Sequence, residues 1–270
     1  MTSTESQIKA AALALGFDPV GITATGPAGK HDAFRAWLDH GFAGEMSWLE
    51  RGAEKRRDSS LPFPQARSAI VVGLDYGGKQ PAGPIARYAR GDDYHDVMLD
   101  RLKELEVRIE EIVGHAISAR AYVDTGPILE RDLAQRAGLG WIGKNTNLIN
   151  PERGSFFFLG ALLTGLPLES DPPFEADRCG TCTRCLDACP TDAFVEPRVL
   201  DATRCISYLT IEHRTSIAPE LRPLVGELVY GCDICQDVCP WNHRFANETG
   251  DAALAPRAEN ADPDLAEFLR

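Results

Sequence analysis

The sequence lacks any long apolar run. Its longest, residues 156–163, is interrupted by Gly160 and is far shorter than the roughly 20 residues that span a bilayer. The polar start MTSTESQIKA also lacks the apolar segment of an export signal. We therefore expect a cytoplasmic protein without a membrane segment. We also expect a monomer.

Positive charge is also scarce. The chain has 28 Lys and Arg against 40 Asp and Glu, a formal net charge of -12, which argues against nonspecific attraction to a polyanion. A nucleic-acid partner would have to meet a local basic surface. Candidate residues are Arg204, His213, Arg214, Arg222, Lys55, Arg56 and Arg57. By charge pattern alone, the favoured interpretation is that these basic residues lie on an ordinary solvated surface.

The usual nucleotide-binding motifs are missing as well. No G-x4-G-K-[ST] is present, and no G-x-G-x-x-G follows a predicted strand. Gly138-x-Gly140-x-x-Gly143 matches the glycine pattern, but it follows a predicted helix. We interpret it as a turn, with a dinucleotide site as the weaker alternative.

Cysteine is what the sequence has in an informative pattern. CGTCTRCLDACP at residues 179–190 is a full C-x2-C-x2-C-x3-C-P run, and CDICQDVCP at residues 232–240 is a shorter one. This spacing is typical of two-cluster ferredoxins, in which the cysteine before proline ligates the other cluster. With Cys205 included, all eight cysteines form two sets of four. The predicted ligands of one [4Fe-4S] cluster are Cys179, Cys182, Cys185 and Cys239, and those of the other are Cys189, Cys205, Cys232 and Cys235.

Structural zinc is an alternative, because C-x2-C pairs also form tetrahedral zinc sites. Zinc motifs, however, pair two such units at a distance, whereas three cysteines at this spacing and a fourth before proline indicate a cubane cluster. A disulfide framework is less favoured in a chain of 270 residues without a signal segment.

The rest of the chain predicts an α+β fold. Apolar periodicity indicates helices at residues 4–15, 33–39, 46–51, 94–113 and 128–137, and strands at 20–24, 69–76, 119–123 and 155–164. A proline-rich boundary follows at 169–175. We expect a catalytic α/β domain at 1–170, a ferredoxin-like module with two [4Fe-4S] clusters at 171–245, and at 246–270 a tail or the beginning of a further helical region.

Asp124 is the candidate catalytic residue. It follows a predicted strand and precedes the helix that carries Glu130 and Arg131, a position where open sheets present ligand-contacting groups. A carboxyl group shielded there by a bulky cofactor would hold its proton more tightly and could act as a general acid. On sequence alone, a helix-capping or turn aspartate is the more common role.

Several long motifs together closely resemble the epoxyqueuosine reductase family. They are RYARGDDYH (87–95), VDTGPILER (123–131), AGLGWIGKNTNLI (137–149), GSFFFLG (154–160), RCISYLTIEHR (204–214) and both cysteine runs. The resemblance implies a nitroreductase-like, cobalamin-binding α/β domain before the ferredoxin module. It also implies a cytoplasmic oxidoreductase that reduces epoxyqueuosine to queuosine in the anticodon loop of tRNA, the last step of queuosine biosynthesis, with electrons from an unidentified donor.

The same resemblance assigns site residues. Asp124 is implied to be the proton donor, and the corrin pocket is implied to include Arg56, Asp124, Lys144, Asn145, Leu148, Ile149, Asn150, Ser155, Ser207 and Asp233. No cobalt-ligating D-x-H-x-x-G is present: Asp93-x-His95 comes closest, but Met98 occupies the glycine position. We therefore expect cobalt without a protein histidine ligand.

Two other functions stay open at this stage. One is a reductive dehalogenase-like cobalamin enzyme that acts on a small organohalide, although the paired arginines of such export signals are missing. The other is a non-catalytic ferredoxin-type electron carrier. Family members usually continue with a basic helical stretch that helps to hold tRNA, so we expect either a short form or a chain without that part.

Overall fold

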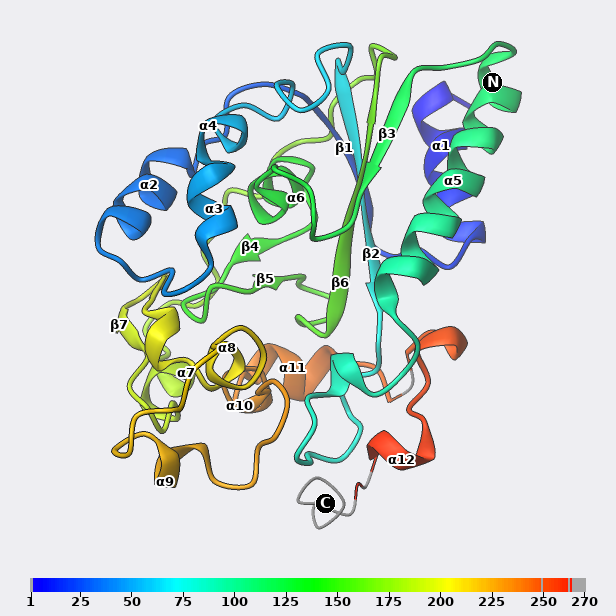
Figure 1. Cartoon of the computed structure of the whole chain (residues 1–270). Coiled ribbons are helices and arrows are strands. Elements are labelled where there is room, and N and C mark those ends of the chain that lie inside the picture. The colour runs from blue at the N-terminus through cyan, green and yellow to red at the C-terminus, as the bar shows by residue number, and fades with distance from the viewer. Residues whose placement is uncertain (1, 249, 262, 264–270) are drawn as a thin grey trace.

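A four-stranded antiparallel sheet with the strand order β1-β2-β6-β3 forms the centre of the molecule (Figure 1). The computed structural model describes residues 2–248, 250–261 and 263. The strands are β1 (Val20–Ala24), β2 (Ser68–Asp75), β3 (Ala119–Tyr122), β4 (Trp141–Ile142), β5 (Leu148–Ile149), β6 (Phe157–Thr164), β7 (Phe194–Glu196) and β8 (Val199–Leu200). The predicted α+β content is thus confirmed.

Helices cover both faces of this sheet and form most of the remaining structure. The α-helices are α1 (Thr4–Ala14), α2 (His31–Asp39), α3 (Ser47–Arg51), α4 (Ala53–Arg56), α5 (Tyr94–Val113), α6 (Glu130–Arg136), α7 (Arg184–Asp187), α8 (Ile206–Ile211), α9 (Arg222–Val225), α10 (Ile234–Asp237), α11 (Pro240–Phe245) and α12 (Ala258–Ala261). Three 3-10 helices are η1 (Arg87–Ala89), η2 (Ala202–Arg204) and η3 (Ala252–Leu254). None of the helices in the described part of the chain is long and apolar enough to cross a membrane.

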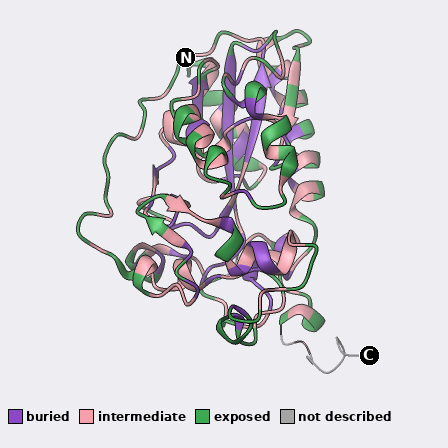
Figure 2. Ribbon diagram, turned by 60° about the vertical axis from the view of Figure 1, so that its left-hand side comes forward, coloured by how far each residue is buried: buried purple, intermediate pink, exposed green. Residues whose placement is uncertain are grey.

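The core lies on both faces of β2 and β6. Ile70 and Val72 point to one side and pack with α1 and α5, whereas Val71 points to the other side and packs with α6. Figure 2 shows the strands of this sheet as the buried centre of the fold. Each fully buried side chain of this size contributes about 1.5–3 kcal/mol to stability. The sheet is therefore a rigid base for the loops at its ends.

The predicted helix at residues 94–113 is confirmed as α5. Its N-terminus is capped by Asp93, whose side chain accepts a hydrogen bond from the backbone of His95, and it ends at Gly114 with φ 77°. Met98 and Leu102 lie on its fully buried face. Because spacing and both end signals are local, the sequence predicts this element well.

The connector at residues 138–145 contains a strand that the sequence interpretation missed. β4 pairs with β5 in a short antiparallel hairpin. A Cβ atom on Gly140 would lie 2.1 Å from the carbonyl oxygen of Ile149, and one on Gly143 would lie 2.5 Å from the Ile149 side chain. These glycines permit close packing against β5, which explains the glycine pattern without a dinucleotide.

The cysteine-containing part of the chain lies below the sheet in Figure 1, from α7 to α11. The proline-rich stretch before it has no helix or strand, but Asp171 anchors it by accepting the backbone N–H of Ile22 at 2.7 Å. Residues 84 and 85 join the two parts, because the backbone of Val229 donates to Pro84 at 2.8 Å.

Residues 250–261 return to the first domain. Arg101 on α5 donates two hydrogen bonds to Asp251, at 2.6 and 2.7 Å, and Leu254 is buried in the same core as α1 and α5. This part of the chain therefore packs against the sheet-bearing domain. The boundaries at 170 and 245 stay predictions, and residues 249, 262 and 264–270 of the predicted tail lie outside the described residues.

Candidate functional site

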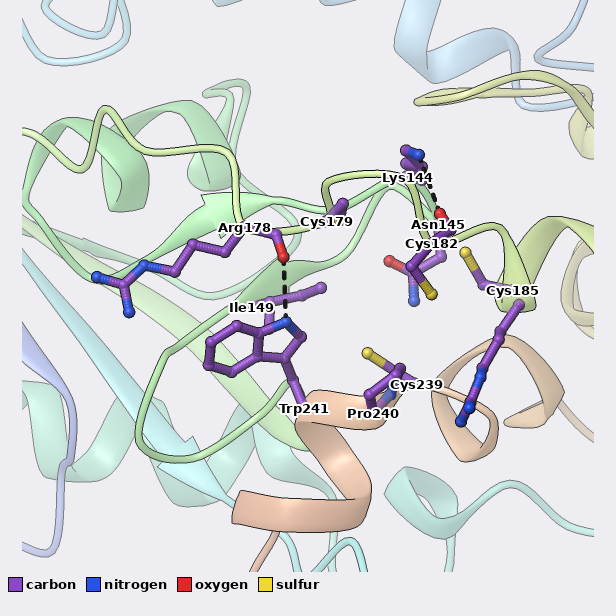
Figure 3. Close-up of a pocket in the computed structure, with 11 residues that line it drawn as sticks. Lys144, Asn145, Ile149, Arg178, Cys179, Cys182, Cys185, Cys239, Pro240 and Trp241 are labelled. Atoms are coloured by element: carbon purple, nitrogen blue, oxygen red, sulfur yellow. Dashed lines mark hydrogen bonds between the residues drawn. The ribbon is translucent and has the colours of Figure 1, made fainter.

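Four cysteines from both runs surround one hollow. Cys179, Cys182 and Cys185 of the first run and Cys239 of the second line a cavity of about 240 Å³. Figure 3 shows Cys239 reaching the hollow from the start of α11, opposite the loop that carries the other three. These are the four residues that the crossing rule groups as the ligands of one cluster.

The other four cysteines also lie near one another. Burial, followed by the charges of Cys205 and other neighbours, raises the pKa of Cys232 to about 12. Cys189 is among those neighbours. The pKa of Cys235 is raised by burial and then by the charges of Cys232 and Cys205. All eight cysteines are free. Because iron binds thiolates, these cysteines would have to lose protons that burial favours, so binding of a cluster here would depend on pH.

Short helices and prolines aim the crossing ligands. The last cysteine of each run follows a one-turn helix, α7 or α10, and precedes a proline. Pro240 occupies the first turn of α11, where its missing N–H costs nothing, so Cys239 stands at the helix start with extended backbone. Trp141 donates an indole N–H to the sulfur of Cys179 at 3.4 Å. Such N–H to sulfur contacts tune cluster potentials.

The connector between β4 and β5 links the sheet-bearing part of the chain to both cysteine sets. The ammonium of Lys144 donates to the carbonyls of Gly180 and Cys182, at 2.7 and 2.9 Å. The side-chain amide of Asn145, which is 3% exposed, donates to the carbonyl of Cys235 at 3.3 Å. Both residues thus hold cysteine loops, a role that the sequence did not predict.

Asp124 lies just beyond the end of β3 in a left-handed conformation, with φ 56°. Its backbone N–H donates to the carboxyl of Glu130 at 2.7 Å, and its own carboxyl oxygen is 3.8 Å from Nε2 of His95. The Asp124 side chain is 69% exposed. Aspartate tolerates this backbone conformation better than most residues, so the loop presents its carboxyl group outward at little cost.

Ionisable and aromatic side chains from other elements surround this loop. Burial, followed by the charge of Asp124, raises the pKa of Glu130 to about 8. Arg56, at the end of α4, is buried, and desolvation lowers its pKa although Glu130 and Asp124 act in the opposite direction. Tyr94 also lies next to Asp124, and burial is the main cause that raises the Tyr94 pKa. Glu130, with a pKa of about 8, thus lies beside Asp124.

A buried ion-pair network lies beside the second cysteine set. Asp233 accepts from the backbone N–H and the guanidinium of Arg87, at 2.9 and 3.0 Å, and Arg87 also pairs with Asp237 at 2.7 Å. The other carboxyl oxygen of Asp233, Oδ1, is buried without a hydrogen-bond partner. A buried acceptor of this kind is costly unless a bound group supplies a donor.

Comparison with known proteins gives these features a context. Residues 178–242 match the family model of a 4Fe-4S double cluster binding domain, and residues 56–125 match that of epoxyqueuosine reductase QueG, DUF1730. The epoxyqueuosine reductase of Pseudomonas aeruginosa is 46% identical over 94% of this chain and 73% of its own length. That of Synechocystis is 45% identical over 93% of this chain and 87% of its own length.

The chain belongs to the epoxyqueuosine reductase family.

Solved structures agree with this assignment. A crystal structure of epoxyqueuosine reductase with a tRNA-Tyr epoxyqueuosine-modified stem loop has a TM-score of 0.87 and 34% identity, and the match covers 98% of this chain and 72% of that one. A catabolic reductive dehalogenase, 20% identical, has a TM-score of 0.51 over 88% of this chain and 32% of its own, which shows a shared fold. The predicted fold class and 4Fe-4S binding are thus confirmed, and the enzyme is an oxidoreductase.

The other residues assigned to a corrin pocket in this epoxyqueuosine reductase lie in three places. Leu148 and Ile149 are buried on β5, and Asn150 donates to the carbonyl of Leu139 at 2.6 Å. Ser155 bonds Gln236 and Asn242 of the cluster module, and Ser207 is half-buried on α8, two residues after Cys205. Their roles toward a corrin stay predictions.

The sequence does not reveal which residues contact the assigned ones. It gave no role to Arg87, Tyr94 or His95, although all three lie within the family motif RYARGDDYH. Arg87 contacts Asp233 from 146 positions away, and His95 faces Asp124 from α5. Their shared motif could have marked them as functional residues, but only the folded chain shows which residue each of them contacts.

Removing the Lys144 charge is expected to lower the reduction potential of the neighbouring cluster. A cation stabilises the more negative reduced cluster, so Lys144→Met should shift the potential downward by roughly 50–100 mV if an effective dielectric constant near 20 applies. A potentiometric titration followed by electron paramagnetic resonance measures this shift. Lys144→Arg is the control that keeps the charge, and equal potentials in Met and wild-type proteins would contradict the role of the charge.

Proposed function

We propose that this chain reduces epoxyqueuosine to queuosine in the anticodon loop of tRNA, with cobalamin and two [4Fe-4S] clusters. The observation that carries the proposal is the arrangement of the eight cysteines in two neighbouring sets, one of them beside the buried, unpartnered oxygen of Asp233. The stem-loop complex of a relative with 34% identity supports the choice of substrate.

The residues near Asp233 fit a cobalamin. A corrin is edged with amides, and an amide N–H can donate to Asp233 Oδ1, the buried acceptor that the protein leaves unpartnered. Two other assigned residues lie next to the same cysteine set. Ser207 follows Cys205 by two residues, and Asn145 donates a hydrogen bond to the carbonyl of Cys235. Bound cobalamin would supply a low-valent metal centre that can pass electrons to an epoxide.

The two cysteine sets define a direction of electron flow. The set with Cys205 and Cys232, the inner set, neighbours Asp233 and Ser207. The set with Cys179 and Cys182, the outer set, lies beside the exposed loop at Gly180, and its hollow is also lined by Lys144, Asn145 and Ile149. Burial is the main cause that raises the pKa of Cys235 in the inner set, and Cys185 of the outer set is among the neighbours that raise it further. The two sets are therefore neighbours. With clusters bound, the outer set would take up electrons and the inner set would pass them on, one at a time, so that two passages would supply the two electrons of the reduction.

Asp124 is the proton donor in this proposal. Conversion of the epoxide to the alkene releases its oxygen as water, so that oxygen must receive protons. The exposed carboxyl group of Asp124 can deliver one once cofactor and substrate cover it, and Glu130 fixes the backbone of the Asp124 loop. A structure of the Bacillus subtilis enzyme, 33% identical with a TM-score of 0.82, is described as having an aspartate-bearing catalytic loop swung out of the active site.

One experiment tests the substrate. Anaerobic protein with reconstituted clusters and cobalamin is given an epoxyqueuosine-containing anticodon stem-loop and a strong reductant, and the nucleosides are analysed by mass spectrometry. We expect queuosine. A parallel reaction with a brominated phenol tests the dehalogenase alternative, and bromide release without queuosine formation would refute the proposal.

Glu130→Gln is expected to weaken the pH dependence of stability. The raised pKa means that the folded state holds a proton that the unfolded state has lost, so stability falls as pH rises from about 4.5 to about 8 and is level above. Glutamine still accepts the Asp124 N–H but does not titrate. Thermal unfolding between these pH values should therefore show a smaller decrease in the variant. Equal decreases would mean that Glu130 is not the titrating group.

A further inference from the structure

The hollow of the outer cysteine set has a cationic border in an acidic protein. Lys144, Arg178 and Arg184 line it, and among the residues that the structure describes no carboxylate does. Arg178 and Arg184 are exposed, so their charges face solvent. The chain as a whole carries a net charge of -12, which makes this concentration of positive charge a local feature. We call these three residues the cationic rim.

A second hollow adjoins the first at Arg184. It is lined by Arg184, Asp187, Ala188, Val238 and His243, and it lies beside the helices that precede Cys189 and Cys239. Asp187, the carboxylate of this hollow, accepts a hydrogen bond from Thr183 at 2.7 Å. The protein surface beside the outer cysteine set is therefore concave, with Arg184 on the boundary between the two hollows.

We propose that the cationic rim is the docking site of a small acidic protein that carries one electron and reduces the outer cluster. This inference rests on the proposed function, which needs an external reductant. In each encounter the carrier loses one electron and the outer cluster gains it, so one turnover takes two encounters. Complementary charge steers such weak, short-lived complexes and raises the association rate by about 10- to 1000-fold.

RNA is the other anion that this surface could attract. The observations favour a protein carrier, because the groups around Asp124, namely Glu130, Arg56, Tyr94 and His95, are all absent from the lining of both hollows. The modified base must reach Asp124, whereas an electron carrier must reach the outer cluster. A partner that sits on the rim therefore serves the cluster.

The test is a charge reversal at the two exposed arginines. The double variant Arg178→Glu with Arg184→Glu is compared with Lys30→Glu with Lys103→Glu, which changes net charge equally at exposed lysines away from both hollows. Arg178→Lys with Arg184→Lys keeps the charge. The probe is a reduced plant-type [2Fe-2S] ferredoxin, and stopped-flow absorbance follows cluster reduction. We expect a decrease of about tenfold or more in the second-order rate constant for the reversal alone, with weaker salt dependence.

Two further measurements separate the possible failures. Reduced methyl viologen, a small cation that needs no docking, should reduce the clusters of the reversal variant no more slowly than those of the wild type, and iron content shows that the clusters are intact. An unchanged ferredoxin rate in the reversal variant would overturn the proposal. So would a loss of affinity for the anticodon stem-loop with no loss of ferredoxin rate, because the rim would then bind RNA. Cluster reduction is measured without the epoxide, so its result stands even if the proposed substrate is wrong.

Discussion

Asp124→Asn is expected to lower the rate of epoxyqueuosine reduction by about 100- to 10,000-fold, the usual contribution of a positioned general acid. Asparagine has a similar shape and tolerates the left-handed backbone at this position, so the loop and its bond to Glu130 should persist. Only the transferable proton is lost. The rate of queuosine formation, measured with saturating reductant and a stem-loop substrate, reports the effect.

Asp192→Asn is the matched control. Asp192 also has a left-handed backbone, with φ 48°, and is exposed, but it lies in the cysteine module. This variant should keep most of its activity. If Asp124→Asn reduces epoxyqueuosine as fast as Asp192→Asn does, with equal cluster content in both proteins, Asp124 is not the acid.

Cys239→Ser is expected to remove the outer cluster, although Cys239 belongs to the second run. Iron should fall from about eight to about four atoms per chain, since each cubane contains four. Adding Cys182→Ser should cost no further iron, because both residues line the same hollow. Adding Cys232→Ser should instead remove nearly all iron, since Cys232 lies in the inner set.

The two double variants are controls for each other, because each lacks two ligands. Iron and acid-labile sulfide per folded chain, measured anaerobically, distinguish them. The opposite order, with Cys232→Ser and Cys239→Ser keeping four iron atoms, would show that each run holds its own cluster and would contradict the crossing arrangement.

Local signals account for what the sequence predicted well. The bounds of α5 follow from its apolar spacing, the Asp93 cap and Gly114. The grouping of Cys239 with Cys179 follows from a spacing rule, and the shared hollow supports it. The bounds of α5 depend only on residues that are close in the chain, and the cysteine grouping depends only on a spacing that occurs in both runs.

Contacts between distant segments account for what the sequence did not predict. The Lys144 ammonium meets the carbonyl of Gly180 only after the β4–β5 hairpin and the cysteine module come together. The pairing of Arg87 with Asp233 and the return of residues 250–261 to α5 likewise span more than 140 positions. Charged and polar residues have many possible partners, and the fold selects one.

Cobalamin dependence is the most direct test of the central claim that the clusters serve a cofactor bound beside Asp233. Protein with reconstituted clusters is assayed anaerobically for queuosine formation on an epoxyqueuosine stem-loop, with and without added cobalamin. We predict that queuosine forms only when cobalamin is bound. Equal conversion by cobalamin-free protein with intact clusters would contradict the account.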